Sequence, residues 1–427
     1  AYEITTRLVG SEMCIRDIAE TVVPDGLTTE EVESSVCELG DITPDETKDF
    51  DVVVVGAGAA GVPAAGWAAE LGGHVALLQK QSIVVSQGNC GSAIIKSKST
   101  EAGKKMWVHM TNGLCDWRAD TSLLNAYVEN SEEALMWYLN RAGLTDQTEY
   151  GDGSLVDSNK NPSDLLHNDE KEIFAYMCTS QDLTGVWKDR MDTYDFGDEH
   201  CYFFAPWIGP KPKNVGDVLA TVLENVQAKN SNLEAFFNTP AVKLVHENGK
   251  VTGVIAKDEN GKYIQFNASK GVILACGGYS GNETMMNALQ PQSVEQTCVN
   301  YSKPGAKGDG IKACLWAGAI MDQTHTSMIF DRGAIKPDQV GEYGKANDGA
   351  LFWMGSQPFL KVNRHGERFM NESQEYDNAS HASFQQPGHV YAMIHDANFR
   401  EDVDRFHTIG CSALTRYIPG MMEGQLE

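Results

Sequence analysis

The sequence predicts an α/β fold whose first part is a Rossmann-like parallel sheet. The stretch "DVVVV" at 51–55 is a run of β-branched residues, which is typical of a strand buried on both faces. The Gly-rich "GAGAAG" and an Ala-rich helical stretch follow it, and "HVALLQK" at 74–80 then has the pattern of a second parallel strand. These three segments predict one complete strand–helix–strand unit.

The glycine motif between the first strand and the helix predicts a dinucleotide-binding turn. Gly56 would permit the sharp turn, Gly58 would let the backbone approach a diphosphate, and Gly61 would let the helix pack close to the strand. The phosphates would lie at the helix N-terminus, where free amide groups and the helix dipole favour anions. A tight turn without a ligand is the alternative, but the strand before and the helix after the motif favour the dinucleotide.

Gln79 ends the second strand, where such units normally offer an acidic residue to the ribose hydroxyls. An amide oxygen can still accept one hydroxyl hydrogen bond, although without charge assistance. We therefore expect a weaker ribose contact within the same class of site.

The next part of the chain continues the α/β pattern with helices. One helix is predicted over 121–142, with Asp120 as its N-cap and Gly143 as its end. A second is predicted over 215–230, because Val218, Leu219, Val222, Leu223 and Val226 fall on one face.

A three-stranded antiparallel β-meander is predicted after these helices. Two Asn-Gly pairs join alternating segments at 241–246, 251–257 and 262–268, and Asn-Gly favours tight hairpin turns. A buried strand, "GVILACGG", follows directly, and a further helix is expected to begin at 308–310.

Composition and charge exclude several classes of partner. The 427 residues carry a formal net charge of -25 without a local basic run, so nucleic acid and membrane surfaces are not expected partners. No apolar run reaches the roughly 18 residues of a membrane span. The ten cysteines are scattered, without a CxxC or a Cys/His cluster, so no metal site is expected.

Residues 1–50 are interpreted as an acidic leader or linker, part of which we expect to be artefactual. Eleven acidic groups stand against one Lys between residues 17 and 50. We also expect the chain to be truncated at both ends. Two cellular locations are left open. If an amino-terminal signal is missing, we expect an exported, periplasmic protein of an anaerobic bacterium, and otherwise a cytoplasmic protein.

The ordered motifs resemble the flavoprotein-subunit family of fumarate reductases and succinate dehydrogenases, which includes flavocytochrome c type reductases and 3-ketosteroid dehydrogenases. The motifs are "VVVVGAGAAG", "LLQK", the meander, "GVILACGGYSGN", "GDGIKACLWAGA" and "HGERFMNE". The resemblance implies an FAD cofactor whose adenine end lies at the glycine motif and whose ring end lies near 86–93. Ile83 stands near the place where covalent members carry a His, so non-covalent FAD is implied. Lys307 replaces the usual Thr of "TGDG", and the sequence alone does not explain this change.

The cofactor-binding residues that the resemblance implies are Gly56, Gly58, Ala59, Ala60, Gly61, Gln79, Lys80, Ser86, Gln87, Gly88, Asn89, Gly91, Ser92, Ala93, Val242, Ala275, Cys276, Gly277, Gly278, Asn282 and Asp309. The resemblance also implies an FAD-binding domain at 51–321 and an inserted α+β capping domain, incomplete here, at 322–427.

Reduction of an activated double bond needs a hydride, stabilisation of the developing enolate and a proton, and the last two must come from side chains. Tyr376 stands where the fumarate reductases carry a proton-donating Arg, and it resembles the Tyr of the 3-ketosteroid dehydrogenases. His325 is a candidate substrate contact and Glu372 a candidate catalytic carboxylate. The alternative for Tyr376 is an interior tyrosine, and the alternative for His325 is a polar group at a domain junction. Glu372 could instead brace a turn together with Arg368.

The sequence therefore predicts an FAD-dependent oxidoreductase of CH-CH groups, which reduces an enoate or enone in a setting of anaerobic respiration. Its electrons would come from a separate cytochrome, flavin domain or quinol-linked protein. A dicarboxylate substrate is not favoured, because Tyr376 replaces the Arg. A 3-ketosteroid-type dehydrogenase and a flavin-binding remnant without catalysis are the alternative interpretations.

Overall fold

The computed structural model describes residues 42–86, 91–115, 117–144, 166–168, 173–182, 197–209, 214–297, 305–321, 325, 327, 329–330, 333, 355, 357–372, 376–399 and 401–402. They belong to two compact units. Unit 1 is drawn from residues 1–88, 215–295 and 300–326, and unit 2 from 89–214, 296–299 and 327–427. The predicted division of the chain into domains at 51–321 and 322–427 stays a prediction.

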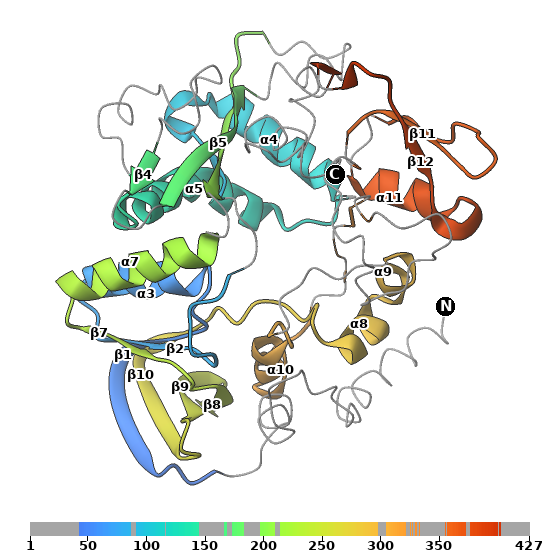
Figure 1. Cartoon of the computed structure of the whole chain (residues 1–427). Coiled ribbons are helices and arrows are strands. Elements are labelled where there is room, and N and C mark those ends of the chain that lie inside the picture. The colour runs from blue at the N-terminus through green and yellow to red at the C-terminus, as the bar shows by residue number, and fades with distance from the viewer. Residues whose placement is uncertain are drawn as a thin grey trace. The chain divides into compact units, whose positions relative to one another are not determined.

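Unit 1 is built on a six-stranded sheet with the strand order β7-β2-β1-β10-β9-β8 (Figure 1). The first four strands in this order are parallel, and β10, β9 and β8 are antiparallel. The sheet therefore joins the predicted parallel part to the predicted meander. Its strands are β1 (Glu46–Val55), β2 (Val75–Leu78), β7 (Leu233–Phe236), β8 (Ala241–Glu247), β9 (Lys250–Lys257) and β10 (Tyr263–Leu274).

The strand β10 connects the two halves of the sheet. Its residues 263–267 pair with β9, and it also pairs with β1 along almost its whole length. The last strand of the meander and the buried strand after it, predicted as separate segments, are thus one continuous strand. Its carboxyl end consequently lies beside the carboxyl end of β1, where the glycine motif begins.

The strand β1 begins at Glu46, five residues before the predicted start of the body at Asp51. Aromatic packing explains the extension: the buried Phe50 ring stacks on Phe266 and contacts Phe236 edge-on. The last residues of the predicted acidic leader therefore belong to the sheet.

Two helices, α3 (Gly61–Glu70) and α7 (Val215–Lys229), lie side by side over one face of this sheet (Figure 1). The apolar face predicted for the second helix is confirmed, because all five of its predicted residues are buried. Unit 1 also contains α8 (Glu283–Leu289) and α10 (Asp309–Trp316), and α9 (Pro291–Gln296) ends where the two units meet in the sequence.

Unit 2 contains a four-stranded antiparallel sheet with the order β3-β6-β5-β4 and a two-stranded sheet of β11 and β12. The predicted helix at 121–142 is confirmed as α5: Asp120 accepts a hydrogen bond from the Ser122 N–H at 2.8 Å, and Gly143 follows the helix at φ 71°. The elements of unit 2 are β3 (Ala93–Ile94), β4 (Leu166–Asn168), β5 (Ile173–Asp182), β6 (Tyr202–Gly209), β11 (Leu360–Val362), β12 (Ala392–Ile394), α4 (Glu101–Leu114), α5 (Thr121–Arg141), α11 (Tyr376–Phe384) and the 3-10 turns η1 (Lys96–Lys98) and η5 (Pro387–His389).

Among the helices that the structure describes, none combines the length and the apolarity needed to cross a bilayer.

Candidate functional site

A pocket of about 980 Å³ lies at the carboxyl ends of the parallel strands of unit 1. Val55, Leu78 and Leu274 are the last residues of β1, β2 and β10, and all three line it. Open α/β sheets bind their ligands at this edge. The predicted site residues in the lining are Gly56, Gly58, Ala59, Ala60, Gln79, Lys80, Ser86, Ala275, Cys276, Gly277, Gly278, Asp309 and His325.

The glycine motif has approaches at Gly56 and Gly61 that are too close for a side chain, and a tight approach at Gly58. A Cβ on Gly56, whose φ is 103°, would lie 2.3 Å from the Ala275 carbonyl oxygen. A Cβ on Gly61 would lie 1.7 Å from the Gly56 oxygen, and one on Gly58 would lie 3.2 Å from the Val85 oxygen. The motif thus closes tightly on itself and on β10, and it leaves bare backbone at the start of α3. This arrangement fits the diphosphate of a dinucleotide.

Gln79 connects the glycine motif to the loop after β2. Its Oε1 accepts a hydrogen bond from the Ala57 N–H at 3.3 Å, and its Nε2 donates to the Ile83 oxygen at 2.8 Å. The side chain is therefore engaged within the protein at both ends, with one lone pair of Oε1 left for a ribose hydroxyl. Its amide supports the turn, and the ribose contact stays a prediction.

Lys80 bridges the loop after β2 to the start of α10. Its Nζ donates to the Asp309 Oδ2 at 2.8 Å and to the Gly305 oxygen. The Asp309 side chain is only 14% exposed, and the Lys312 Nζ lies 3.8 Å from its other carboxylate oxygen. Charged groups of both signs thus meet on one wall of the pocket.

Cys276 also lines the pocket, and its thiol is protonated. Burial raises its pKa to about 12, and the nearby Asp309 carboxylate adds to the increase. A thiol in this state is a poor nucleophile at neutral pH. Its Sγ donates weakly to the Val55 oxygen at 3.5 Å, so it acts as a packing group between β1 and β10.

Three other predicted cofactor residues lie in unit 1 beside the lining. Gly61 is buried at the first position of α3. Val242 is buried in β8 between two residues that do line the pocket. Asn282 caps α8 by accepting from the Met285 N–H at 3.1 Å. Their roles toward the cofactor stay predictions.

Gly91, Ser92 and Ala93, which were predicted near the flavin ring, belong to unit 2. The Ser92 hydroxyl shares a 2.9 Å hydrogen bond with the Tyr127 hydroxyl of α5, and Ala93 pairs with Phe204 of β6. Gln87, Gly88 and Asn89 lie outside the described residues.

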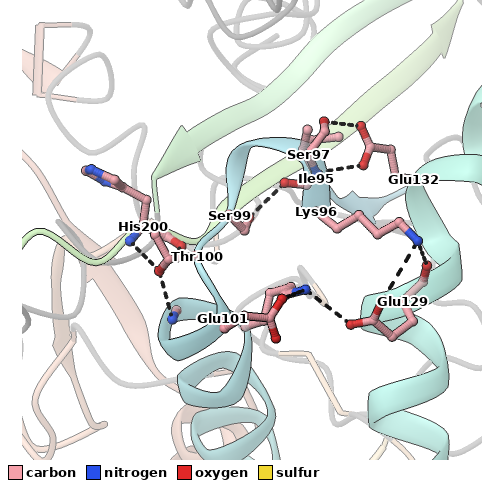
Figure 2. Close-up of polar contacts among 11 residues, drawn as sticks. Ile95, Lys96, Ser97, Ser99, Thr100, Glu101, Glu129, Glu132 and His200 are labelled. Carbon is pink, nitrogen blue, oxygen red and sulfur yellow. Dashed lines mark hydrogen bonds and ion pairs between the residues drawn. The ribbon is translucent and has the colours of Figure 1, made fainter.

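The segment that follows is fixed to α5 and α4 by a polar network (Figure 2). Ser97 donates from both its N–H and its Oγ to the Glu132 carboxylate, and the Lys96 Nζ donates to the Glu129 oxygen at 2.6 Å. Thr100 caps α4 and also accepts from the His200 N–H at 3.2 Å. The segment after the predicted ring-end residues is therefore held in a defined conformation.

The three predicted catalytic residues lie in different settings. His325 lines the pocket of unit 1, and Tyr376 is the first residue of α11 in unit 2. Glu372 is almost buried and accepts two hydrogen bonds from the Arg368 Nε and one, at 2.6 Å, from Nη2. It also accepts from the Lys361 N–H at 3.2 Å. These contacts lower the pKa of Glu372, mainly through the Arg368 hydrogen bond, and they fit a carboxylate that braces the turn.

Some lining residues were not predicted from the sequence. Thr239, Pro240 and Ala241 follow β7, whose pairing with β2 brings them to the pocket edge. The signal that could have found them is the short alternating stretch at 233–236, which is the fourth parallel strand.

The chain belongs to the FAD binding domain family, whose model matches residues 51–407. A relative, the vinyl phenol reductase of Lactiplantibacillus plantarum, is 25% identical over 82% of this chain and 64% of its own length. The 3-oxosteroid 1-dehydrogenase of Mycobacterium tuberculosis is 35% identical over 37% of this chain and 26% of its own length. The open conformation of a flavocytochrome c3 fumarate reductase has the same fold, with a TM-score of 0.53 and 19% identity over 95% of this chain and 66% of that one.

The prediction of FAD as the cofactor is thus confirmed at the level of the family, as is the α/β fold class. The pocket geometry agrees with it, because the glycine motif opens at the carboxyl edge of the sheet. The non-covalent attachment stays a prediction. The chain spans about two thirds or less of the length of these relatives.

Proposed function

We propose that this chain is the flavin-binding and substrate-covering part of an FAD-dependent oxidoreductase that reduces the activated double bond of an enoate or enone. The observation that carries the proposal is the pocket of unit 1, which places the glycine motif, Lys80 and Asp309 around one cavity. Membership of the FAD family and the similarity to a vinyl phenol reductase support it.

The protein has to hold the cofactor, hold the substrate and deliver a proton. Bound FAD, once reduced, supplies the hydride to one carbon of the double bond. The backbone around Gly56 and Gly61 binds the diphosphate, and Gln79 and Lys80 fix the loop beside it. We assign the second carbon's proton to the hydroxyl of Tyr376, because a phenolic hydroxyl can donate a proton to a developing carbanion.

Each turnover would add one hydride and one proton to the substrate, so two electrons have to be supplied from outside this chain before the next turnover. We propose that a separate protein, such as a cytochrome, a flavin domain or a quinol-linked protein, supplies them. This exchange would take place in the periplasm if the protein is exported, and in the cytoplasm otherwise.

A second candidate is a 3-ketosteroid-type dehydrogenase, in which the same tyrosine acts as a base. The 35% identity to the 3-oxosteroid 1-dehydrogenase favours it, as does Tyr376 at the start of α11. A tyrosine hydroxyl can move a proton in either direction, so the residue does not fix the direction of the reaction.

Paired anaerobic assays separate the two candidates. The purified protein, loaded with FAD, is given reduced viologen and a panel of enoates and enones, and in a parallel assay an oxidised dye and the saturated compounds. We expect turnover in the first assay. Turnover in the second assay alone would establish the dehydrogenase, and bound FAD without turnover in either would favour the non-catalytic remnant.

A further inference from the structure

Two loops form one wall of the pocket: residues 277–282, which follow β10, and residues 305–308, which precede α10. Both loops contribute lining residues. Backbone hydrogen bonds join them, from the Gly281 N–H to the Ala306 oxygen at 2.9 Å and from the Gly308 N–H to the Gly278 oxygen at 3.1 Å. We call residues 277–282 and 305–308 the wall loops.

Lys307 adds two further links between the wall loops. Its Nζ donates to the Gly281 oxygen at 2.5 Å, and its own carbonyl oxygen accepts from the Asn282 Nδ2 at 3.1 Å. The ammonium group therefore lies along loop 277–282 at Gly281, the residue whose N–H is already bonded to loop 305–308. Removing the side chain would leave the Gly281 oxygen without this donor.

Lys307 also belongs to a group of charges beside the same wall, of which Lys80 and Asp309 line the pocket. Its pKa is lowered, first by burial and then by the neighbouring ammonium group of Lys80, whereas Asp309 and Glu283 act in the opposite direction. Lys312 approaches Asp309 to 3.8 Å. Three ammonium groups thus face two carboxylates in a chain whose formal net charge is -25. A local excess of positive charge beside the pocket of so acidic a protein points to an anionic ligand.

We propose that Lys307 is a positioning residue of the cofactor site: it ties the wall loops together and supplies the positive charge that favours a diphosphate in the pocket. The proposal rests on the FAD site and not on the reaction assigned above. If the protein acts on another substrate, the proposed role of Lys307 still holds. It also explains why a lysine can stand where the resembling proteins carry threonine.

Binding to the flavin-free protein tests the proposal without any turnover. FAD, ADP and adenosine are titrated by calorimetry into the unsubstituted protein and into Lys307→Gln, which retains a donor for the Gly281 oxygen but removes the charge. We expect FAD and ADP to bind about fivefold more weakly at low salt, as for one partly exposed charge near an anion. Adenosine, which lacks phosphate, should bind equally to both proteins, and the fivefold loss should shrink at high salt.

Three variants separate the charge from the loop contact. Lys307→Arg should bind FAD as the unsubstituted protein does, and Lys307→Thr should lose at least as much affinity as Lys307→Gln. Lys250→Thr is the matched control, because Lys250 is an exposed lysine of unit 1 at the first position of β9, outside the wall loops. Unchanged FAD and ADP affinity in Lys307→Gln would overturn the proposal, as would an equal, salt-independent loss for adenosine. Failure of the unsubstituted protein to bind FAD would contradict the cofactor site and this role together.

Discussion

Gly61→Ala is the sharpest test of the cofactor turn, because it adds one methyl group at the closest approach in the motif. That methyl carbon would lie 1.7 Å from the Gly56 carbonyl oxygen and 2.9 Å from the Gly56 carbonyl carbon. Both atoms are backbone, so no flexible side chain can move aside. Overpacking of this kind costs about 1–3 kcal/mol, and we expect about 3 kcal/mol here because the turn itself has to open.

The expected loss is measurable in two ways. A domain of 150–250 residues loses about 2–4 °C of Tm per kcal/mol, so the Tm of the unit should fall by about 6–12 °C. If the displaced turn must be restored on binding, the FAD affinity should fall about a hundredfold. Differential scanning calorimetry and FAD titration measure the two quantities.

Gly72→Ala is the matched control, since Gly72 also lies at an end of α3 but has open space around its Cβ position. Its φ of 88° makes the alanine strained, at a cost of about 1–2 kcal/mol, without touching the pocket. It should lower the Tm and leave FAD binding unchanged. A Gly61→Ala protein with unaltered Tm and FAD affinity would refute the steric account of the motif.

Three further predictions concern single residues. Gln79→Glu should bind FAD about tenfold more weakly, because a carboxylate cannot donate to the Ile83 oxygen and repels it; tighter binding in the titration would show that the ribose contact dominates. Glu372→Gln should lower the free energy of unfolding of unit 2 by about 1–2 kcal/mol at neutral pH, as measured by urea denaturation. Because Arg368 holds the pKa of Glu372 below its ordinary 4.5, the contribution is complete above that pH and is lost as the pH falls through the lowered value; a difference between the two proteins that persists in strong acid would contradict this. Tyr376→Phe should retain FAD and lose most turnover in the viologen assay, and unimpaired turnover would leave this tyrosine a structural role.

The sequence predicted the sheet and the turn well because both depend on local chemistry. A run of β-branched residues before Gly56 has few alternatives to a buried strand, and the Asn248-Gly249 pair fixes its hairpin through two positive φ angles. The helix caps, such as Asp120, are local for the same reason.

What the sequence could not provide was long-range pairing. β10 appeared as two strands because only its first part, residues 263–267, pairs with β9, whereas it pairs with β1 along almost its whole length. The early start of β1 depends on Phe50 meeting Phe266 more than 200 positions along the chain, as the sequence numbering shows. Gln79 and Lys307 likewise acquire their roles from partners that only the fold brings close.

Rapid mixing of the reduced, FAD-loaded protein with single enones and enoates in the absence of oxygen tests the central claim most directly. At least one of them should return the flavin absorbance to that of the oxidised form, with one saturated product formed per flavin. If none does so, while a saturated ketosteroid reduces the oxidised flavin, the reductase assignment is contradicted and the dehydrogenase replaces it.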